Sequence, residues 1–282
     1  MAAAEGEAIY ASPTEYVSHH LTNLTFGQID GHWGFAHSPE EAGEMGFWAI
    51  NVDSMLMSVI LGALFVGLFK FVISKATTDA PRAKSWQNII EIIVEMVQDS
   101  IKNSFHARNA MIGPLALTIF CWIFLMNAMD LVPVDWIPTL AQTVAGDPHT
   151  YFRAVPTTDL NITLGFAVSV FFLIIFYSIK IKGVGGFISE FTMHPFPKWY
   201  LAPFNLLLEL PGFFAKPVSL ALRLYGNFFA GETIFLVIAL IGYWQLPLHF
   251  GWAVFHILVV TLQAYLFMML TIVYLDQAHT DH

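Results

Sequence analysis

The stretch PVSLALRLYGNFFAGETIF, residues 217–235, places a single arginine, Arg223, inside a run of apolar and small residues. The run continues on both sides, from about Pro203 to Ile241. At about 1.5 Å per residue, a helix of this length approaches roughly 55 Å, whereas the hydrocarbon core of a bilayer is only ~30 Å thick. The sequence therefore predicts a membrane helix that tilts strongly or kinks, with Pro211 and Pro217 as candidate kink points.

The rest of the chain has the same apolar character. Of its 282 residues, 56% are hydrophobic and 12% are charged, and the mean hydropathy is +0.62. Soluble domains carry about a quarter charged residues, so a water-soluble chain of this composition would expose large apolar patches. The net charge of −9 argues against a nucleic-acid partner, which would need a basic face.

Five apolar runs are long enough to span a bilayer, and a sixth segment is amphipathic. From Trp86 to Arg108, apolar residues recur at helical spacing between acidic and amide residues, which predicts a helix lying on the membrane surface. We expect loops over residues 139–158 and 182–200. The fold class is therefore an all-α membrane protein with five transmembrane helices plus one amphipathic surface helix, the last two spans being long and strongly tilted. The spans are expected at Val52 to Ile73, Gly113 to Met129, Asp159 to Lys180, Pro203 to Ile241 and Pro247 to Asp276.

The first 45 or so residues differ from the rest because they are polar and acidic. They lack a basic region followed by an apolar core, so we expect no cleavable signal peptide. We divide the chain into an extracytoplasmic N-terminal segment, residues 1–45, and a membrane domain, residues 46–282, whose key hairpin covers residues 203–276. The histidines of the first segment match no metal-ligand spacing, and we expect solvated loop residues rather than a metal site. These histidines are His19, His20, His32 and His37.

Basic residues predict the orientation, because they concentrate in cytoplasmic loops. One cluster lies between the first two expected spans, a second follows the third span, and only Arg153 falls in a loop on the other side. This places the N-terminus outside and the C-terminus in the cytoplasm. The clusters are Lys70, Lys75, Arg82, Lys84, Lys102 and Arg108, and then Lys180, Lys182 and Lys198.

Placing a polar side chain inside a membrane span costs free energy, so such residues mark candidate functional positions. Arg223 has apolar or small neighbours on both sides, so we interpret it as functional. For Lys216, about two turns nearer the cytoplasmic end, a functional role and snorkelling of its long side chain both stay open. At ~100° per residue these two residues belong to one polar stripe. The stripe consists of Glu209, Lys216, Ser219, Arg223 and Asn227.

A second polar path is expected on another face. Glu232 projects roughly opposite Arg223, and His256 and Gln263, seven residues apart, share one face of the last span. Two laterally offset paths with Arg223 between them indicate two half-channels rather than a continuous pore. Small residues beside the stripe allow close approach of another helix, of this chain or of a partner. They are Gly226, Ala230 and Gly231.

Several segments of the chain carry a family resemblance. Residues 217–235 and the segment FHILVVTLQAYLFMMLTIVYL (255–275) resemble subunit a of F-type ATP synthases, and three further segments resemble its proteobacterial members in the same order. The resemblance covers nearly everything from about residue 45 onward. The further segments are FLMNAMDLVPVDWIP (124–138), AVPTTDLNITL (154–164) and FYSIKIKGVGGF (176–187).

The resemblance implies site residues. Arg223 corresponds to the essential arginine, Glu232 and His256 to the acidic and imidazole groups of the outer half-channel, and Gln263 to a glutamine facing the arginine. Positions matching the outer mouth are Asn127, Asp130, Asp135, Thr157, Asp159 and Asn161. Positions matching the cytoplasmic half-channel are Glu209, Ser219 and Asn227. The chain departs from the pattern at Ala215, where some relatives carry serine, and at Tyr225, where phenylalanine is frequent.

The resemblance also implies a mechanism. A proton passes Asp130, His256 and Glu232 and neutralises a carboxylate on a ring of small two-helix subunits, which turns through lipid and releases the proton to the cytoplasm. Arg223, which stays protonated at working pH, keeps the approaching carboxylate ionised and blocks leakage. The implied partners are the c-ring subunits, a subunit b dimer, the remaining F1Fo complex and the lipid of a bacterial inner membrane, which the chain crosses several times.

Two other classes of function, a stand-alone secondary transporter and a membrane-embedded enzyme, make different predictions. No G-x-x-x-x-G-K-[ST] motif occurs, so we expect a non-catalytic channel subunit without cofactor or metal, whose ATP chemistry resides in partner chains. A stand-alone secondary transporter with an intramembrane arginine predicts an internal repeat, and none is found. A membrane-embedded enzyme would need a nucleophile–base pair or a metal motif, but H-E-x-x-H is absent and Cys121 has no histidine near it in sequence.

Overall fold

A computed structural model describes residues 13–29, 31–36, 38–76, 85–107, 109–133, 136–146, 150–193 and 195–280. In this part of the chain, five helices are long and apolar enough to cross a membrane, which confirms the predicted number of spans. The protein is therefore a multi-pass membrane protein. The five helices are α3 (Val52–Ser74), α5 (Ile112–Ala128), α7 (Leu160–Met193), α8 (Ala202–Ala239) and α9 (Gln245–His279).

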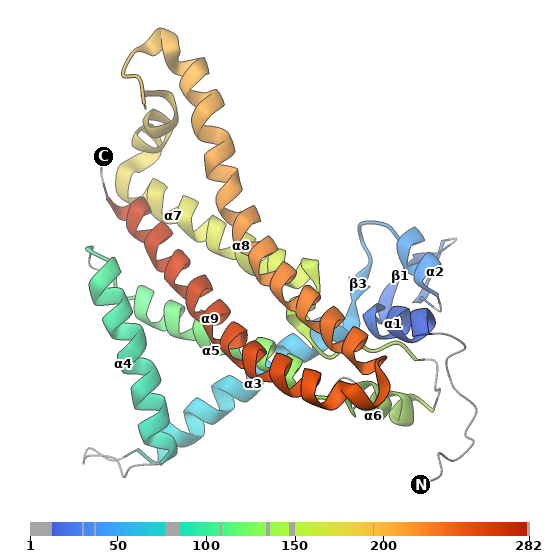
Figure 1. The fold of residues 1–282 in the computed structure, drawn as a ribbon. Coiled ribbons are helices and arrows are strands. Elements are labelled where there is room, and N and C mark those ends of the chain that lie inside the picture. Colours follow the sequence, from blue (N-terminus) through green and yellow to red (C-terminus); the bar gives the residue numbers. More distant parts are fainter. Residues whose placement is uncertain are drawn as a thin grey trace, which may run out of the picture.

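The bundle has two distinct ends (Figure 1). One end, here called the sheet end, carries the N-terminal segment, helix α6 (Trp136–Ala145) and the turn between α8 and α9. The other, here called the C-terminal end, carries the connection from α7 to α8 and the last turns of α9. The amphipathic helix α4 (Trp86–Ser104) is present as predicted and packs against α3, α5 and α9.

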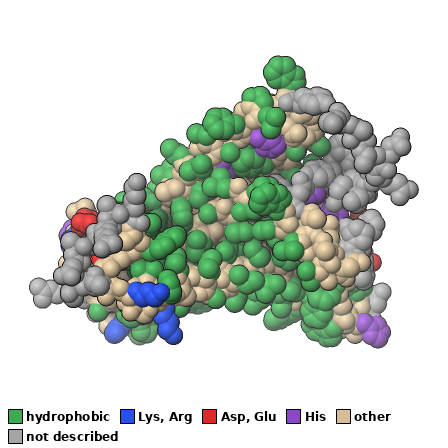
Figure 2. Space-filling model, turned by 90° about the horizontal axis from the view of Figure 1, so that it is seen from below, with side chains coloured by type: hydrophobic (Ala, Val, Ile, Leu, Met, Phe, Trp, Pro, Cys, Tyr) green, Lys and Arg blue, Asp and Glu red, His purple; other side chains and the backbone are tan. Residues whose placement is uncertain are grey.

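The surface of the bundle is largely apolar, and Figure 2 shows one face on which hydrophobic side chains predominate. Large hydrophobic side chains are exposed on every spanning helix except α5, whose core-facing position buries most of them. In water such a surface would promote aggregation, whereas lipid or a partner subunit can cover it. Examples are Val59 and Phe71 of α3, Phe172 of α7, Leu222 of α8 and Leu258 of α9.

The N-terminal segment contains structure that the sequence analysis did not assign. Strands β1 (Thr25–Ile29), β2 (His32–Phe35) and β3 (Ile50–Asn51) form an antiparallel sheet in the order β2-β1-β3. Helices α1 (Pro13–Leu21) and α2 (Pro39–Glu44) flank it. The interpretation of the histidines as solvated was wrong for His20, because its side chain is buried, whereas His32 is exposed and His37 lies outside the described residues.

Two of the expected loops are partly helical. Residues 136–145 form α6, and α7 continues to Met193 instead of ending near Lys180. The helical path of α7 is broken at Gly183, whose φ of 72° and ψ of 168° lie outside the helical region. Glycine adopts positive φ without the steric cost that a side chain adds, so the chain turns here and resumes the helix.

The last two spans form a long hairpin. Helix α8 has 38 residues, about 57 Å at the usual rise, and runs without interruption through Pro211 and Pro217. It packs chiefly along α7, while α9 packs chiefly along α5. Both helices exceed the bilayer thickness, and their strong tilt in the membrane stays a prediction.

Candidate functional site

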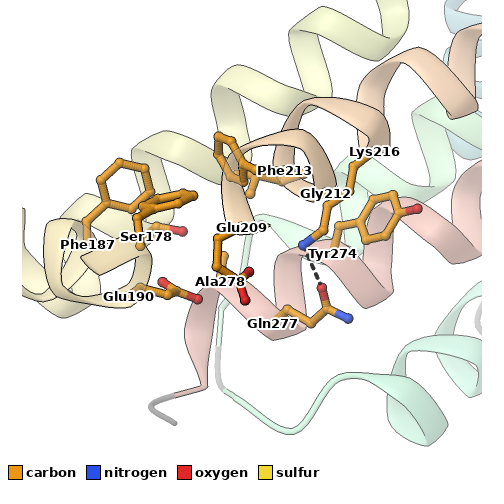
Figure 3. A pocket seen from close by; sticks show the side chains of 12 residues that line it. Ser178, Phe187, Glu190, Glu209, Gly212, Phe213, Lys216, Tyr274, Gln277 and Ala278 are labelled. Atoms are coloured by element: carbon orange, nitrogen blue, oxygen red, sulfur yellow. Dashed lines mark hydrogen bonds between the residues drawn. The ribbon is translucent and has the colours of Figure 1, made fainter. Parts of the chain in front are cut away.

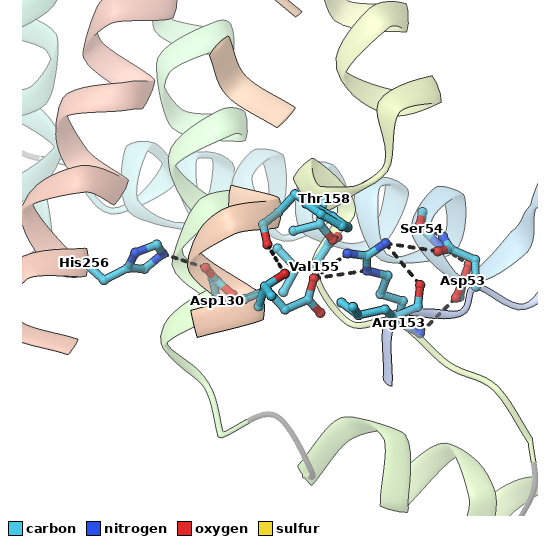
Figure 4. Close-up of polar contacts among 12 residues, drawn as sticks. Asp53, Ser54, Asp130, Arg153, Val155, Thr158 and His256 are labelled. Carbon is cyan, nitrogen blue, oxygen red and sulfur yellow. Dashed lines mark hydrogen bonds and ion pairs between the residues drawn. The ribbon is translucent and has the colours of Figure 1, made fainter. Parts of the chain in front are cut away.

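At the sheet end, a histidine and a carboxylate meet inside the bundle. Nε2 of His256, on α9, lies 2.5 Å from Oδ2 of Asp130, in the 3₁₀ turn Met129–Leu131 that extends α5 (Figure 4). Both side chains are buried, and His256 is only 1% exposed. The contact is an ion pair when the imidazole is protonated and a hydrogen bond to the carboxylate when it is neutral, so a proton can reside on either residue.

Gly231 of α8 makes room for this histidine. A Cβ atom added at Gly231 would collide with the His256 ring, so only glycine allows the two helices to approach this closely here. Gly226 differs, because a Cβ added there would meet no described atom within 4 Å. Of the two glycines, Gly231 thus serves packing within the chain, while Gly226 leaves open space on the surface of α8.

Beside the His256–Asp130 contact lies a second buried ion pair, which the sequence analysis missed. Arg153 donates to Oε2 of Glu232 through Nη2 at 2.5 Å and through Nε at 3.2 Å. Arg153 is 5% exposed and Glu232 4%. In the sequence, Arg153 contributed only to the predicted orientation, although its isolation as the one basic residue in its loop was a usable signal.

The backbone around Arg153 is fixed by Asp53, another residue that the sequence analysis did not single out. Asp53 accepts hydrogen bonds from the backbone N–H groups of Arg153 at 2.9 Å, Leu24 at 2.9 Å and Ser54 at 2.7 Å. The carboxylate thereby joins the loop before α7, the start of β1 and the start of α3. Its position in the first turn of an apolar span was the available signal, because a buried carboxylate needs such partners.

Two predicted polar positions are buried near these pairs. The amide of Asn127 and the hydroxyl of Thr157 are fully buried, and no described residue forms a hydrogen bond with either side chain. Thr157 lies in a 3₁₀ turn that contacts α3, α5 and α8. Buried polar atoms without protein partners are costly unless water reaches them, so this part of the interior is suited to hydration.

The other predicted positions of the outer mouth are placed differently. Asp159 accepts from Nδ2 of Asn51 at 2.8 Å and from the backbone N–H of Asn161 at 2.9 Å, which fixes the beginning of α7. The Asn161 side chain is exposed and lines an apolar surface groove beside Thr118 and Gly165. Asp135 lies outside the described residues.

At the C-terminal end, charged side chains line a cavity of about 430 Å³ (Figure 3). Glu209 and Lys216 of α8, which the sequence analysis placed on one stripe, both line it. Nζ of Lys216 donates to Oε1 of Gln277 at 3.0 Å. Glu190 of α7 also lines the cavity and forms an ion pair of 3.2 Å with Lys182, a contact that the sequence did not indicate.

Arg223 lies between the two polar ends and points away from the interior. Its side chain is exposed, and it forms no hydrogen bond or ion pair with any residue of the described ranges. Ser219, Leu222 and Asn227 are exposed beside it on α8. Gln263, expected to face the arginine, is buried and accepts a hydrogen bond of 2.9 Å from Asn227 instead.

Apart from the amide of Gln263, which is hydrogen-bonded to Asn227, the interior at the level of Arg223 is apolar. Side chains of α8 and α9 fill the space between the cavity at the C-terminal end and the ion pairs at the sheet end, and each is at most 2% exposed. Among these side chains a proton has no polar group to follow. The layer, here called the apolar plug, consists of Leu220, Leu224, Phe228, Val260, Ala264 and Phe267.

The described residues do not suggest a metal centre. Within the ranges given above, no three His, Cys, Asp or Glu side chains come together in a way that could hold a metal ion.

Comparison with known proteins identifies close relatives. The family model described as ATP synthase A chain matches residues 55–276. ATP synthase subunit a 2 of Hahella chejuensis is 61% identical over 271 residues, covering 95% of this chain and 97% of the relative. ATP synthase subunit a of Thiobacillus denitrificans is 57% identical over 281 residues, covering 97% and 98%. The Pseudomonas syringae pv. tomato protein of the same name is 57% identical over 282 residues, covering 95% and 97%.

Proposed function

Since this chain belongs to the ATP synthase A chain family, we propose that it is the proton-translocating subunit a of an F-type ATP synthase. In this role it conducts protons through two offset half-channels and couples their flow to the rotation of a c-ring. The observation that carries the proposal is the position of Arg223, a permanent cation exposed on an apolar helix face without a partner in the described chain.

An unpaired arginine on such a face requires a partner from outside the chain. A charged side chain near the bilayer centre costs from about 2.5 to more than 10 kcal/mol. A carboxylate on a neighbouring membrane helix would compensate this cost, and the open space at Gly226 lets such a helix come close. The ring subunits, each with one membrane carboxylate, are the partner that meets both requirements.

The sheet end then provides the outer half-channel. Protons reach the His256–Asp130 contact and the Glu232–Arg153 pair, where titratable groups and buried polar atoms lie together. Arg153 is not a proton carrier, because a guanidinium does not deprotonate in proteins. We assign to it the orientation of Glu232, and we assign to Asn127 and Thr157 the support of water in the same path.

The cavity at the C-terminal end provides the cytoplasmic half-channel. Glu209 and Ser219 lie along the α8 face that leads from this cavity toward Arg223. Lys216, held by Gln277, places a positive charge at the cavity wall, where it would repel a released proton toward the cytoplasm. A released proton can therefore leave through a wide, polar opening.

The apolar plug explains why the two half-channels must be connected by the ring. Protons cannot cross Leu224 and Phe228, so each proton has to leave the outer path on a ring carboxylate and return after nearly a full turn. Arg223 keeps the arriving carboxylate ionised and prevents a direct return. Each proton crossing 100 mV supplies about 2.3 kcal/mol, so several protons are needed for one ATP.

The proposal includes the setting of the protein. We place it in a bacterial inner membrane, with the sheet end and residues 1–45 in the periplasm and the C-terminus in the cytoplasm, following the distribution of basic residues. Its partners are the c-ring, a subunit b dimer and the rest of the F1Fo complex. The chain itself is non-catalytic, and residues 46–282 form the membrane domain whose hairpin 203–276 faces the ring. A stand-alone transporter would instead enclose Arg223 in a substrate pocket, whereas Arg223 is exposed.

Cross-linking in the assembled complex tests the position of the ring. A cysteine at Ala230, which is exposed on the Arg223 side of α8, should form disulfides with cysteines placed along the ring helix. A cysteine at Val168, exposed on α7, is the matched control and should not. Cross-links at Val168 but not at Ala230 would contradict the proposed interface.

A further inference from the structure

The N-terminal helix α1 contributes a histidine to the wall of the sheet-end site. His20 is 7% exposed, although it belongs to a polar segment outside the predicted spans. It lines a small cavity together with Asp130, Arg153 and Glu232, the residues of the two buried pairs. The cavity thus connects the N-terminal segment directly with the groups proposed to carry protons.

The structure holds His20 in this position through its neighbours. Arg153 donates through Nη1 to the carbonyl of Leu21 at 3.5 Å and to Oδ1 of Asn23 at 3.4 Å. The residue after these, Leu24, is fixed by its hydrogen bond to Asp53. The arginine that orients Glu232 therefore also fixes the segment carrying His20.

The size and lining of the cavity suit a proton relay. Its volume of about 20 Å³ is enough for a single water molecule, which needs about 10–15 Å³ of this kind of volume and several polar partners. The titratable and charged groups that line it are His20 from α1, Asp130 from the turn after α5, Arg153 from the loop before α7 and Glu232 from α8. Of these, only the imidazole changes its charge near neutral pH without a perturbing environment.

We propose that His20 is the outermost proton-relay residue of the outer half-channel. The imidazole takes up one proton from the periplasmic water and gives one proton to the cavity, from which it reaches Glu232 or Asp130. The imidazole of His20 is therefore unchanged after each cycle. This inference rests on the proposed function. It gives the N-terminal segment a direct part in proton uptake.

His20→Gln tests the relay, because glutamine keeps hydrogen-bonding capacity but does not titrate. The whole ATP synthase is reconstituted in liposomes, and ATP synthesis is measured over a range of pH on the periplasmic side at constant total driving force. We expect a severalfold lower rate, with a defect that grows as the periplasmic pH rises and protons become scarce. His32→Gln is the matched control, since His32 is exposed on β2 and does not line the cavity, and it should leave the profile unchanged.

A chemical rescue separates a relay from a wall residue. In His20→Ala, imidazole added on the periplasmic side should restore synthesis, whereas pyrazole, a ring of the same size but a far weaker base, should not. Equal rescue by both compounds, or a His20→Gln rate equal to the original at every pH, would overturn the inference.

Arg223→Ala in the same preparation distinguishes failure of this inference from failure of the proposed function. If Arg223→Ala abolishes synthesis while the His20→Gln rate equals the original at every pH, only the inference fails, whereas normal synthesis in Arg223→Ala contradicts the proposed function itself.

Discussion

Nη2 of Arg153 lies 2.5 Å from Oε2 of Glu232 in a buried ion pair. The two residues are 79 positions apart in the chain. Arg153 also binds the N-terminal segment through Leu21 and Asn23. One guanidinium therefore connects a proposed proton-carrying carboxylate with the part of the chain outside the spans. A pair of this kind is most sensitive to the loss of one partner, because the remaining charge stays buried without compensation.

The first prediction concerns this pair. We expect Arg153→Ala to destabilise the chain by about 3–5 kcal/mol, the usual cost of breaking a buried pair, and to slow proton uptake. Arg153→Lys keeps the charge but loses the planar fork, so its effect should be smaller. The measurements are the amount of chain in the membrane and ATP-driven quenching of a pH-sensitive dye per assembled complex. Lys102→Ala, on the exposed side of α4, serves as the control, and an Arg153→Ala protein that behaves like it would refute the assigned role.

The second prediction concerns the titratable groups of the outer path. His256→Gln and Glu232→Gln keep hydrogen-bonding groups beside Asp130 and Arg153 but remove the proton-carrying function. We expect proton uptake to fall roughly 100-fold, the lower end of what a positioned acid–base group contributes. The complex should still assemble, which co-purification with the ring subunits measures. His32→Gln, in an exposed strand position, should be neutral. Normal uptake in both site variants would show that protons follow another path.

The third prediction compares two glycines of α8. Helix propensity favours alanine over glycine by up to about 1 kcal/mol at both positions, so a difference between them reports the contact each one makes. Gly231→Ala should destabilise the isolated chain by about 1–3 kcal/mol, because the added methyl group collides with the His256 ring. Gly226→Ala should leave the isolated chain stable but weaken coupled pumping, because its methyl group projects toward the ring. Thermal unfolding in detergent and pumping in vesicles measure the two effects, and similar behaviour of both variants would contradict the assignment.

The fourth prediction concerns the apolar plug. Leu224→Asn places a hydrogen-bonding group in the dry layer between the half-channels, and we expect a severalfold higher passive proton permeability. Leu224→Ala is the matched control, because an apolar cavity stays dry, and it should lower stability by about 2–5 kcal/mol without a leak. Permeability is measured in vesicles from which the soluble ATPase head has been removed. A leak in the alanine variant, or none in the asparagine variant, would count against the plug.

Much of this architecture could be predicted from sequence because it is encoded locally. Helical spacing alone places Glu209, Lys216 and Arg223 on one stripe and Glu232 on the opposite face, and the structure has Arg223 exposed and Glu232 buried accordingly. Apolar length was sufficient to identify the five spans. The resemblance added Asp130 and Asn127, whose burial no periodicity would indicate.

The remaining features depend on contacts between distant segments. Neither Arg153 nor Asp53 has a local pattern that reveals its partners, because the partners come from other loops and helices. His20 was assigned to solvent since its neighbours in sequence are polar, and its burial follows from the packing of α1 on α8. The continuation of α7 beyond Lys180 was missed because GVGG reads as a turn, although only Gly183 departs from helical geometry.

The central claim is that Arg223 couples proton movement to the ring. Arg223→Lys keeps a positive charge but shortens the reach and removes the planar fork, and Arg223→Ala removes the charge. We expect both variants to lose ATP-driven pumping and proton-driven synthesis while ring and soluble head still assemble. Arg223→Ala should in addition let protons leak, because the electrostatic barrier between the half-channels is gone.

The most direct test is ATP-driven dye quenching in vesicles containing the assembled Arg223 variants, together with passive proton permeability after the soluble head is removed. The account predicts no quenching in either variant and a raised permeability in Arg223→Ala. Near-normal quenching in either variant, at a normal amount of assembled complex, would contradict it.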